Sequence, residues 1–160
     1  MESNDISKVG LMMWLFWPEI KMARLDERAI VPVRKHWDDA GLDFCALHDT
    51  LIPSMEYKTV GTGITVEMPS GFFGLLKPKG GNNHLVGAGV VDQGYQGEIM
   101  FKIFNPTKDT MSFSAGQPIG QMVLIPVIRP TPVEVSLDEV HKEMTERANT
   151  GGILEDVEQV

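Results

Sequence analysis

The chain has 160 residues, of which 42% are hydrophobic and 22% are charged, so it has the composition of an ordinary globular protein with room for one domain. Its 22 acidic and 14 basic side chains give a formal net charge of −8, which repels a phosphate backbone and argues against a nucleic-acid partner. The single cysteine, Cys45, excludes an intrachain disulfide and is expected in the core. A reducing, cytoplasmic location fits this cysteine usage.

The N-terminal part contains an apolar segment from Val9 to Trp17. It is too short to cross a bilayer, which takes roughly 20 residues, and it follows acidic residues instead of the basic stretch of a signal peptide. We therefore expect no membrane partner, and we predict that the segment packs on the domain or on a neighbouring subunit. Residues 1–21 are predicted to form an N-terminal extension and residues 22–144 the folded domain.

From Ala29 onward, short β-type runs are separated by Gly, Pro, Asn and Asp, a spacing typical of an all-β sandwich or barrel. The predicted strands are residues 29–34, 42–47, 57–68, 71–77, 85–91, 98–105, 111–114 and 119–128. Alternation is clearest over residues 98–104, where every second residue is Ile or Phe. Because Met100 and Phe104 make the opposite face partly apolar, we expect burial on both faces, as at a subunit interface.

One short helix is predicted near the C-terminus. Ser136 can cap it together with Glu139 three residues on, and Leu137 and Val140 would then line one face. Residues 145–160 follow, with two adjacent glycines and several acidic residues, and they are predicted to form a flexible arm that is mobile without ligand.

The segment from Gly87 to Gly97 combines a glycine-rich backbone, a carboxylate directly after an apolar strand, and a tyrosine three residues later. Gly87 and Gly89 let a flat base approach the main chain closely, so backbone N–H and C=O groups can read the edge of a pyrimidine. A simple turn between two strands is the alternative interpretation, because Asp and Gly are common in turns.

Two side chains of this segment suit chemistry on a deoxynucleotide. The ring of Tyr95 can lie against a deoxyribose and leave no room for a 2′-hydroxyl. Asp92 can orient and deprotonate a water molecule for attack on phosphorus.

Several short segments in a fixed order carry a resemblance to a known family. They are residues 40–44, 52–53, 60–64, 69–71, 87–97 and 116–121. Over about residues 22–127 their order closely resembles that of the homotrimeric deoxyuridine triphosphatases (dUTPases). The resemblance implies an all-β fold, a dUTPase-like β-barrel or jelly roll of the β-clip type. It also implies hydrolysis of dUTP to dUMP and pyrophosphate with Mg²⁺, in a homotrimer whose sites each draw on three subunits.

The resemblance assigns roles to individual residues. Asp92 takes the place of the catalytic carboxylate that activates water, and Tyr95 that of the ring that selects deoxyribose. The base-reading hairpin corresponds to Gly87, Ala88, Gly89 and Val90. In two further motifs, Asp43 corresponds to an aspartate that acts on the metal-bound triphosphate through water, and Gln121 to a glutamine that contacts phosphate.

The family's second motif usually reads Pro-Arg-Ser-Gly, whereas this chain has Pro78, Lys79, Gly80 and Gly81. Lys79 can supply positive charge as a mobile point charge, and Gly80 and Gly81 can offer backbone N–H groups to a phosphate oxygen. The serine hydroxyl is missing. The polar residues 82–84 stand nearby as substitutes, although polar loop residues are usually solvated.

The fifth motif is also altered. Arg147 can reach the γ-phosphate and the Gly151-Gly152 pair can bend over it, but Ile153 stands where an aromatic ring would stack on uracil. An aliphatic residue keeps apolar cover and loses stacking on the order of 1 kcal/mol.

Two classes of function follow. The first is a Mg²⁺-dependent dUTP diphosphatase in which Lys79, Gln121 and Arg147 hold the triphosphate. The alternative is a nucleotide-binding regulator on the same scaffold, with little or no turnover. A zinc deaminase is disfavoured, because the four histidines and Cys45 lack metal-ligand spacing. The compact size would suit a virus- or phage-encoded enzyme acting in the cytoplasm of its host.

Overall fold

The structure is a computed structural model that describes residues 18–82 and 84–140. The apolar segment from Val9 to Trp17 and the arm at residues 145–160 lie outside the described residues, so the predictions made for them stay predictions. The chain divides into two units, residues 1–128 and residues 129–160, and each is described by itself. Within the described ranges, no helix is long and apolar enough to span a membrane.

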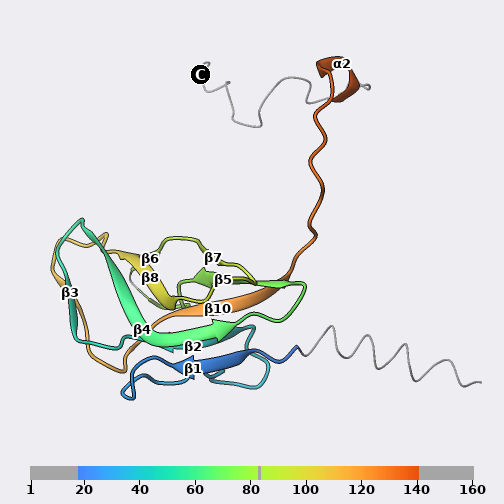
Figure 1. The fold of residues 1–160 in the computed structure, drawn as a ribbon. Coiled ribbons are helices and arrows are strands. Elements are labelled where there is room, and N and C mark those ends of the chain that lie inside the picture. Colours follow the sequence, from blue (N-terminus) through green and yellow to red (C-terminus); the bar gives the residue numbers. More distant parts are fainter. Residues whose placement is uncertain (1–17, 83, 141–160) are drawn as a thin grey trace, which may run out of the picture. The chain divides into compact units, whose positions relative to one another are not determined.

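The described part of the first unit consists of antiparallel β-strands, which confirms the all-β prediction (Figure 1). One four-stranded sheet has the order β1 (Lys21–Arg24), β4 (Tyr57–Glu67), β8 (Glu98–Phe104) and β6 (Leu85–Val86). The other has the order β2 (Gly41–Cys45), β10 (Pro118–Pro126), β5 (Phe72–Lys77) and β7 (Gly89–Val91). A two-stranded sheet pairs β3 (Thr50–Ile52) with β9 (Met111–Phe113).

The hydrophobic core is set by the alternation in β8. Ile99, Phe101 and Ile103 are at most 1% exposed, and the ring of Phe101 lies 5.7 Å from that of Phe44 in β2. On the opposite face, Met100 is 45% exposed. The burial of the inward face of β8 is therefore confirmed. The burial of its outward face against a second subunit stays a prediction.

Two strand predictions are wrong. Residues 29–34 form no strand, and only Val33 makes an isolated bridge, to Asp43. The reason is Pro32, which is buried and offers no N–H to a ladder. The predicted strand at residues 85–91 is divided into β6 and β7, which belong to different sheets, because the chain crosses between the sheets at Gly87 and Ala88.

Two short strands were missed from the sequence. β1 begins at Lys21, and its residues lack strict alternation because only Met22 is partly buried. β3 has three residues, too few for a periodic pattern to stand out.

The described part of the second unit contains the start of the predicted helix, α2 (Leu137–Val140). Oε2 of Glu139 accepts the backbone N–H of Ser136 at 3.2 Å and the Ser136 hydroxyl at 3.0 Å, which is one half of the predicted capping box. The other half is absent, because the backbone N–H of Glu139 donates to the carbonyl of Ser136 at 3.0 Å and not to its hydroxyl. Leu137 is 84% exposed and Val140 is 53% exposed, so the predicted apolar face is uncovered within the described part of this unit.

Candidate nucleotide-binding site

A cavity of about 250 Å³ lies between β7 and β8, and we call it the hairpin cavity. The two strands belong to different sheets and do not pair with each other, so the predicted β-hairpin is wrong. They are joined by a turn in which Tyr95 donates its backbone N–H to the carbonyl of Asp92 at 3.1 Å. The cavity is lined by Thr59, Leu76, Gly89, Val90, Val91, Tyr95, Glu98, Ile99, Met100 and Lys102. Most of its wall therefore comes from one short stretch of sequence.

Within the described residues, β7 is an edge strand, because it pairs with β5 on one side and with no strand on the other. Its main chain is thus free to pair with a planar ligand along that edge. Gly89 permits the close fit of β7 on β5, since a Cβ at this position would lie 3.0 Å from Cδ1 of Leu76. Gly89 and Val90 line the hairpin cavity, whereas Gly87 donates its N–H to the carbonyl of Lys102 at 2.9 Å and Ala88 is exposed.

The ring of Tyr95 is held in one orientation. Its hydroxyl donates to the carbonyl of Glu98 at 2.8 Å, and a Cβ added to Gly97 would lie 2.5 Å from the hydroxyl oxygen. The side chain is 41% exposed and lines the hairpin cavity. A fixed, half-exposed ring at the mouth of this cavity suits the predicted role of a wall against the sugar.

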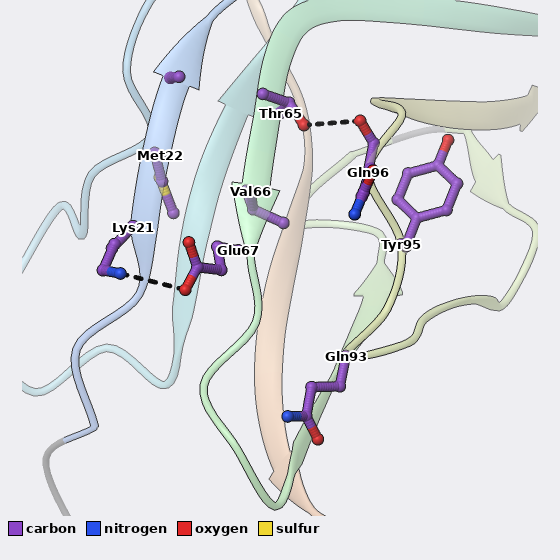
Figure 2. A pocket seen from close by; sticks show the side chains of 9 residues that line it. Lys21, Met22, Thr65, Val66, Glu67, Gln93, Tyr95 and Gln96 are labelled. Carbon is purple, nitrogen blue, oxygen red and sulfur yellow. Dashed lines mark hydrogen bonds and ion pairs between the residues drawn. The ribbon is translucent and has the colours of Figure 1, made fainter.

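Tyr95 also borders a second cavity, of about 420 Å³, between the hairpin turn and strands β1 and β4 (Figure 2). Figure 2 shows Gln93, Tyr95 and Gln96 on the hairpin side of this cavity. Thr65 of β4 donates its hydroxyl to the carbonyls of Gln96 at 3.3 Å and Gly97 at 3.0 Å. These bonds attach the turn to β4 and support the orientation of Tyr95.

Three strands of the second sheet bring the other predicted residues together. Gln121 of β10 lies opposite Asp43 of β2 and opposite Lys77 of β5. The ammonium group of Lys79, two residues beyond the end of β5, forms an ion pair with Asp43. Gln121 donates its side-chain amide to the carbonyl of Pro78 at 2.9 Å, which fixes the start of the loop that follows β5.

These residues line a polar cavity of about 310 Å³. Its wall consists of Lys35, His36, Asp39, Ala40, Gly41, Asp43, Lys79, Gly80 and Gln121. The structure therefore places Asp43, Lys79, Gly80 and Gln121 in one site, as their predicted roles require. Gly81 follows in the loop with a positive φ of 84°, a backbone conformation that favours glycine.

The polar cavity and the hairpin cavity have no lining residue in common. Asp92 is exposed and starts the turn directly after β7, next to Val91, which lines the hairpin cavity. The predicted arm residues Arg147, Gly151, Gly152 and Ile153 lie outside the described residues. The described part of one chain thus presents two cavities that are lined by different residues.

Asp43 is the candidate contact for a divalent metal. Within residues 18–82 and 84–140, no group of three or more His, Cys, Asp or Glu side chains could hold a metal ion. Mg²⁺ keeps several waters and is usually bound through one or two carboxylates plus substrate phosphates. Asp43 in the polar cavity fits such a contact through water.

Two local environments change acid strengths beside the polar cavity. The backbone N–H of His36 donates to Oδ2 of Asp39 at 2.8 Å and lowers the pKa of that carboxyl. Partial burial raises the pKa of the Cys45 thiol, and the negative charge of Asp43 adds to the effect. Asp39 therefore stays ionised and Cys45 stays protonated at neutral pH.

Sequence reasoning missed several residues of this region. Lys35, His36 and Asp39 line the polar cavity, and their signal was a charged run directly before Ala40. His84, expected to be solvated with its polar neighbours, is only 5% exposed. Its Nε2 lies 2.8 Å from the carbonyl of Ile119, and its ring packs edge-on against Phe113 with the centroids 5.0 Å apart.

Comparison with known proteins agrees with this arrangement. The model of the dUTPase family matches residues 27–152. The deoxyuridine 5′-triphosphate nucleotidohydrolase of Gloeothece citriformis is 36% identical over 140 residues, which cover 83% of this chain and 93% of the relative. The mitochondrial human protein of the same name is 35% identical over 138 residues, covering 83% of this chain and 53% of the relative.

Solved structures show the same fold. A dUTPase from phage phi11 of S. aureus superimposes with a TM-score of 0.71 at 23% identity, covering 77% of this chain and 99% of that one. A mutant of the phi11 dUTPase, in which a structural Mg(II) ion is coordinated, gives a TM-score of 0.69 at 23% identity, covering 73% of this chain and 96% of that one.

The edge strand, the hairpin cavity and the polar cavity define an all-β protein equipped to hold a nucleotide. Together with the match of the family model over most of its length, they establish that the chain belongs to the dUTPase family.

Proposed function

We propose that this chain hydrolyses dUTP to dUMP and pyrophosphate, with Asp92 as the group that activates water. Membership of the dUTPase family makes the chain a dUTP nucleotidohydrolase. The observation that carries the assignment of Asp92 is its position. It follows directly on the free edge strand β7, whose residues line the hairpin cavity.

In the proposed reaction, water attacks the α-phosphorus. The bond from that phosphorus to the oxygen that bridges it to the β-phosphate breaks, so that dUMP keeps only the α-phosphate. Asp92 accepts a proton from the attacking water, and pyrophosphate leaves with the bridging oxygen. In this arrangement the free edge of β7 pairs with uracil, and the ring of Tyr95 lies against the deoxyribose.

The polar cavity is proposed to hold the phosphates. Lys79 supplies charge, Gly80 and Gly81 supply backbone N–H groups, and Gln121 supplies its side-chain amide. Asp43 would hold Mg²⁺ through water when the nucleotide is bound, and the ion would then offset the negative charge of the triphosphate.

A homotrimer is proposed as the active form. The support is that the hairpin cavity and the polar cavity share no lining residue, so a neighbouring subunit can bring one against the other. In the same proposal, Arg147 and the Gly151-Gly152 pair close over the γ-phosphate from an arm, with Ile153 as an apolar cover. A cytoplasmic location, in a cell or in the host of a virus or phage, stays a prediction.

The alternative of a regulator without turnover gains no support from the curated relatives, which carry the name nucleotidohydrolase. It makes a distinct prediction: the purified chain would bind dUTP and release no pyrophosphate.

Pyrophosphate release from dUTP, dCTP, dTTP and UTP with Mg²⁺ tests the proposal, with the mass of the assembly measured on the same sample. We expect dUTP to be preferred by a trimer. Binding of dUTP without pyrophosphate release would favour the regulator, and an active monomer would contradict the shared site.

A further inference from the structure

The loop between β1 and β2 brings two basic side chains to the polar cavity. Lys35 and His36 line the same cavity of about 310 Å³ as Asp43, Lys79 and Gln121. Neither residue belongs to the segments that carry the resemblance to the family. The next residue of the loop, Trp37, is 87% exposed. The position of these two side chains is therefore a feature of the tertiary structure.

The loop is attached at both ends. The backbone N–H of Asp43 donates to the carbonyl of Val33 at 2.9 Å, which attaches the loop to β2. Nε of Arg34 donates to the carbonyl of Asp39 at 3.0 Å, which joins the two ends of the turn. Lys35 and His36 are thus presented from a turn whose two ends are fixed beside the cavity.

Asp39 holds the turn closed and orients the His36 ring. The carboxylate accepts the backbone N–H of His36 at 2.8 Å, and its Oδ2 lies 3.3 Å from the ring Nδ1. In return, the backbone N–H of Asp39 donates to the carbonyl of His36 at 3.2 Å. With Nδ1 directed at Asp39, the opposite ring nitrogen, Nε2, is the one left for a second partner.

The basic side chains of the polar cavity differ in whether they already have an acidic partner. Lys79 is paired with Asp43, and His36 is paired with Asp39. Lys35 forms no ion pair within the described part of the chain. An incoming polyphosphate must compete with Asp43 for Lys79, whereas it can take Lys35 without breaking an existing pair.

We propose that Lys35 and His36 are substrate-binding residues that contact the β- and γ-phosphates of dUTP from the loop between β1 and β2. The inference rests on the proposed function, since it assigns a part of the same substrate to this loop. It also offers a physical reason why a second motif without serine or arginine suffices: the missing charge comes from another loop of the same cavity.

The test compares variants of the full-length chain in its native assembly. Lys35→Ala is expected to raise KM for dUTP and Kd for a non-hydrolysable imido analogue of dUTP by about tenfold, the effect of one lost contact to a charged group. His36→Ala is expected to raise both constants by about threefold, because the ring already has Asp39 as a partner. Lys35→Arg keeps the positive charge, so KM for dUTP and Kd for the imido analogue should stay within about twofold of the values for the parent chain.

The matched control is Lys108→Ala, which removes another exposed lysine, from the loop between β8 and β9. Binding of dUMP is the second control, because dUMP lacks the β- and γ-phosphates. Loss of affinity for the imido analogue with unchanged dUMP binding would support the inference. Values of Kd for Lys35→Ala and His36→Ala that match those of Lys108→Ala would overturn it.

The measurements distinguish a failure of the proposed function from a failure of the inference about Lys35 and His36. If the parent chain binds the imido analogue but releases no pyrophosphate from dUTP, the hydrolase proposal is overturned and the binding comparison still decides the role of Lys35. If the parent chain binds no deoxynucleotide at all, both are overturned.

Trp37 provides an independent readout beside the two residues. The chain has three tryptophans, so replacing Trp14 and Trp17 by Phe leaves Trp37 alone. Its emission should change when the imido analogue is added and should not change with dUMP. A response to both ligands, or to neither, would speak against a loop that senses the terminal phosphates.

Discussion

The hairpin cavity and the polar cavity are built in opposite ways. Most of the hairpin cavity comes from residues 89–102, and within the described part of the chain β7 pairs with β5 only. The polar cavity draws charged and polar groups from three segments, residues 35–43, 79–80 and 121. The difference teaches that, in the proposed function, base recognition depends on backbone geometry within one short segment, whereas phosphate binding depends on charged and polar groups that only folding brings together.

The largest expected effect is at the border of the hairpin cavity. Asp92→Asn should lower kcat by about 10²- to 10⁴-fold, because the amide cannot accept the proton of the attacking water. Kd for the imido analogue should stay within threefold, because the assigned contacts to base, sugar and phosphates do not involve Asp92. Unchanged kcat in the variant would refute the assigned mechanism.

Gly97→Ala tests the sugar wall of the hairpin cavity. The new methyl group would lie 2.5 Å from the Tyr95 hydroxyl oxygen and 2.7 Å from Cζ, so the ring must move and the bond to Glu98 must break. We expect the preference for dUTP over UTP to fall by about tenfold, measured as a ratio of kcat/KM values.

Gly94→Ala is the matched control for this change, because a Cβ at Gly94 meets no atom within 4 Å. If Gly97→Ala kept the full preference for dUTP, the selection of deoxyribose would have to come from another group.

Gly41→Ala tests the polar cavity without altering a charge. A Cβ at Gly41 would collide with the side-chain amide of Gln121, which would then lose its bond to Pro78. KM for dUTP should rise by about three- to tenfold, the effect of one displaced hydrogen-bonding group.

The comparison requires that Gly41→Ala leave dUMP binding unchanged, since the hairpin cavity is lined by other residues. An equal loss for dUMP and dUTP would indicate that the two cavities are coupled within one chain.

The smallest expected effect is a difference in salt dependence. Raising the ionic strength from 0.1 to 1 M shortens the screening length from about 10 to about 3 Å. Affinity for the imido analogue should fall by about fivefold or more, whereas affinity for uncharged deoxyuridine should change by less than about twofold. Titrations of both ligands at the two salt concentrations check this. Equal salt dependence would remove the distinction between the two cavities.

Much of the fold was readable from residue order. The alternation over residues 98–104 predicted the buried face of β8, and Ser136 with Glu139 predicted the start of α2. Residues 29–34 show the limit of such patterns, because a run rich in Ile and Val around Pro32 cannot complete a strand ladder. The divided strand at residues 85–91 shows another limit, since an apolar run does not reveal a change of sheet.

By itself, the sequence determined the turn after β7: Gly94, Asp92 and Tyr95 lie within a few positions of one another, where local geometry decides which groups meet. It did not reveal that β7 and β8 belong to different sheets. Only the tertiary structure decided that Lys35 and His36 share a cavity with Asp43 and Lys79, and that His84 is buried against Ile119. The physical reason is that the pairing of β2, β10 and β5 brings together segments dozens of residues apart. No local pattern encodes the distance between them.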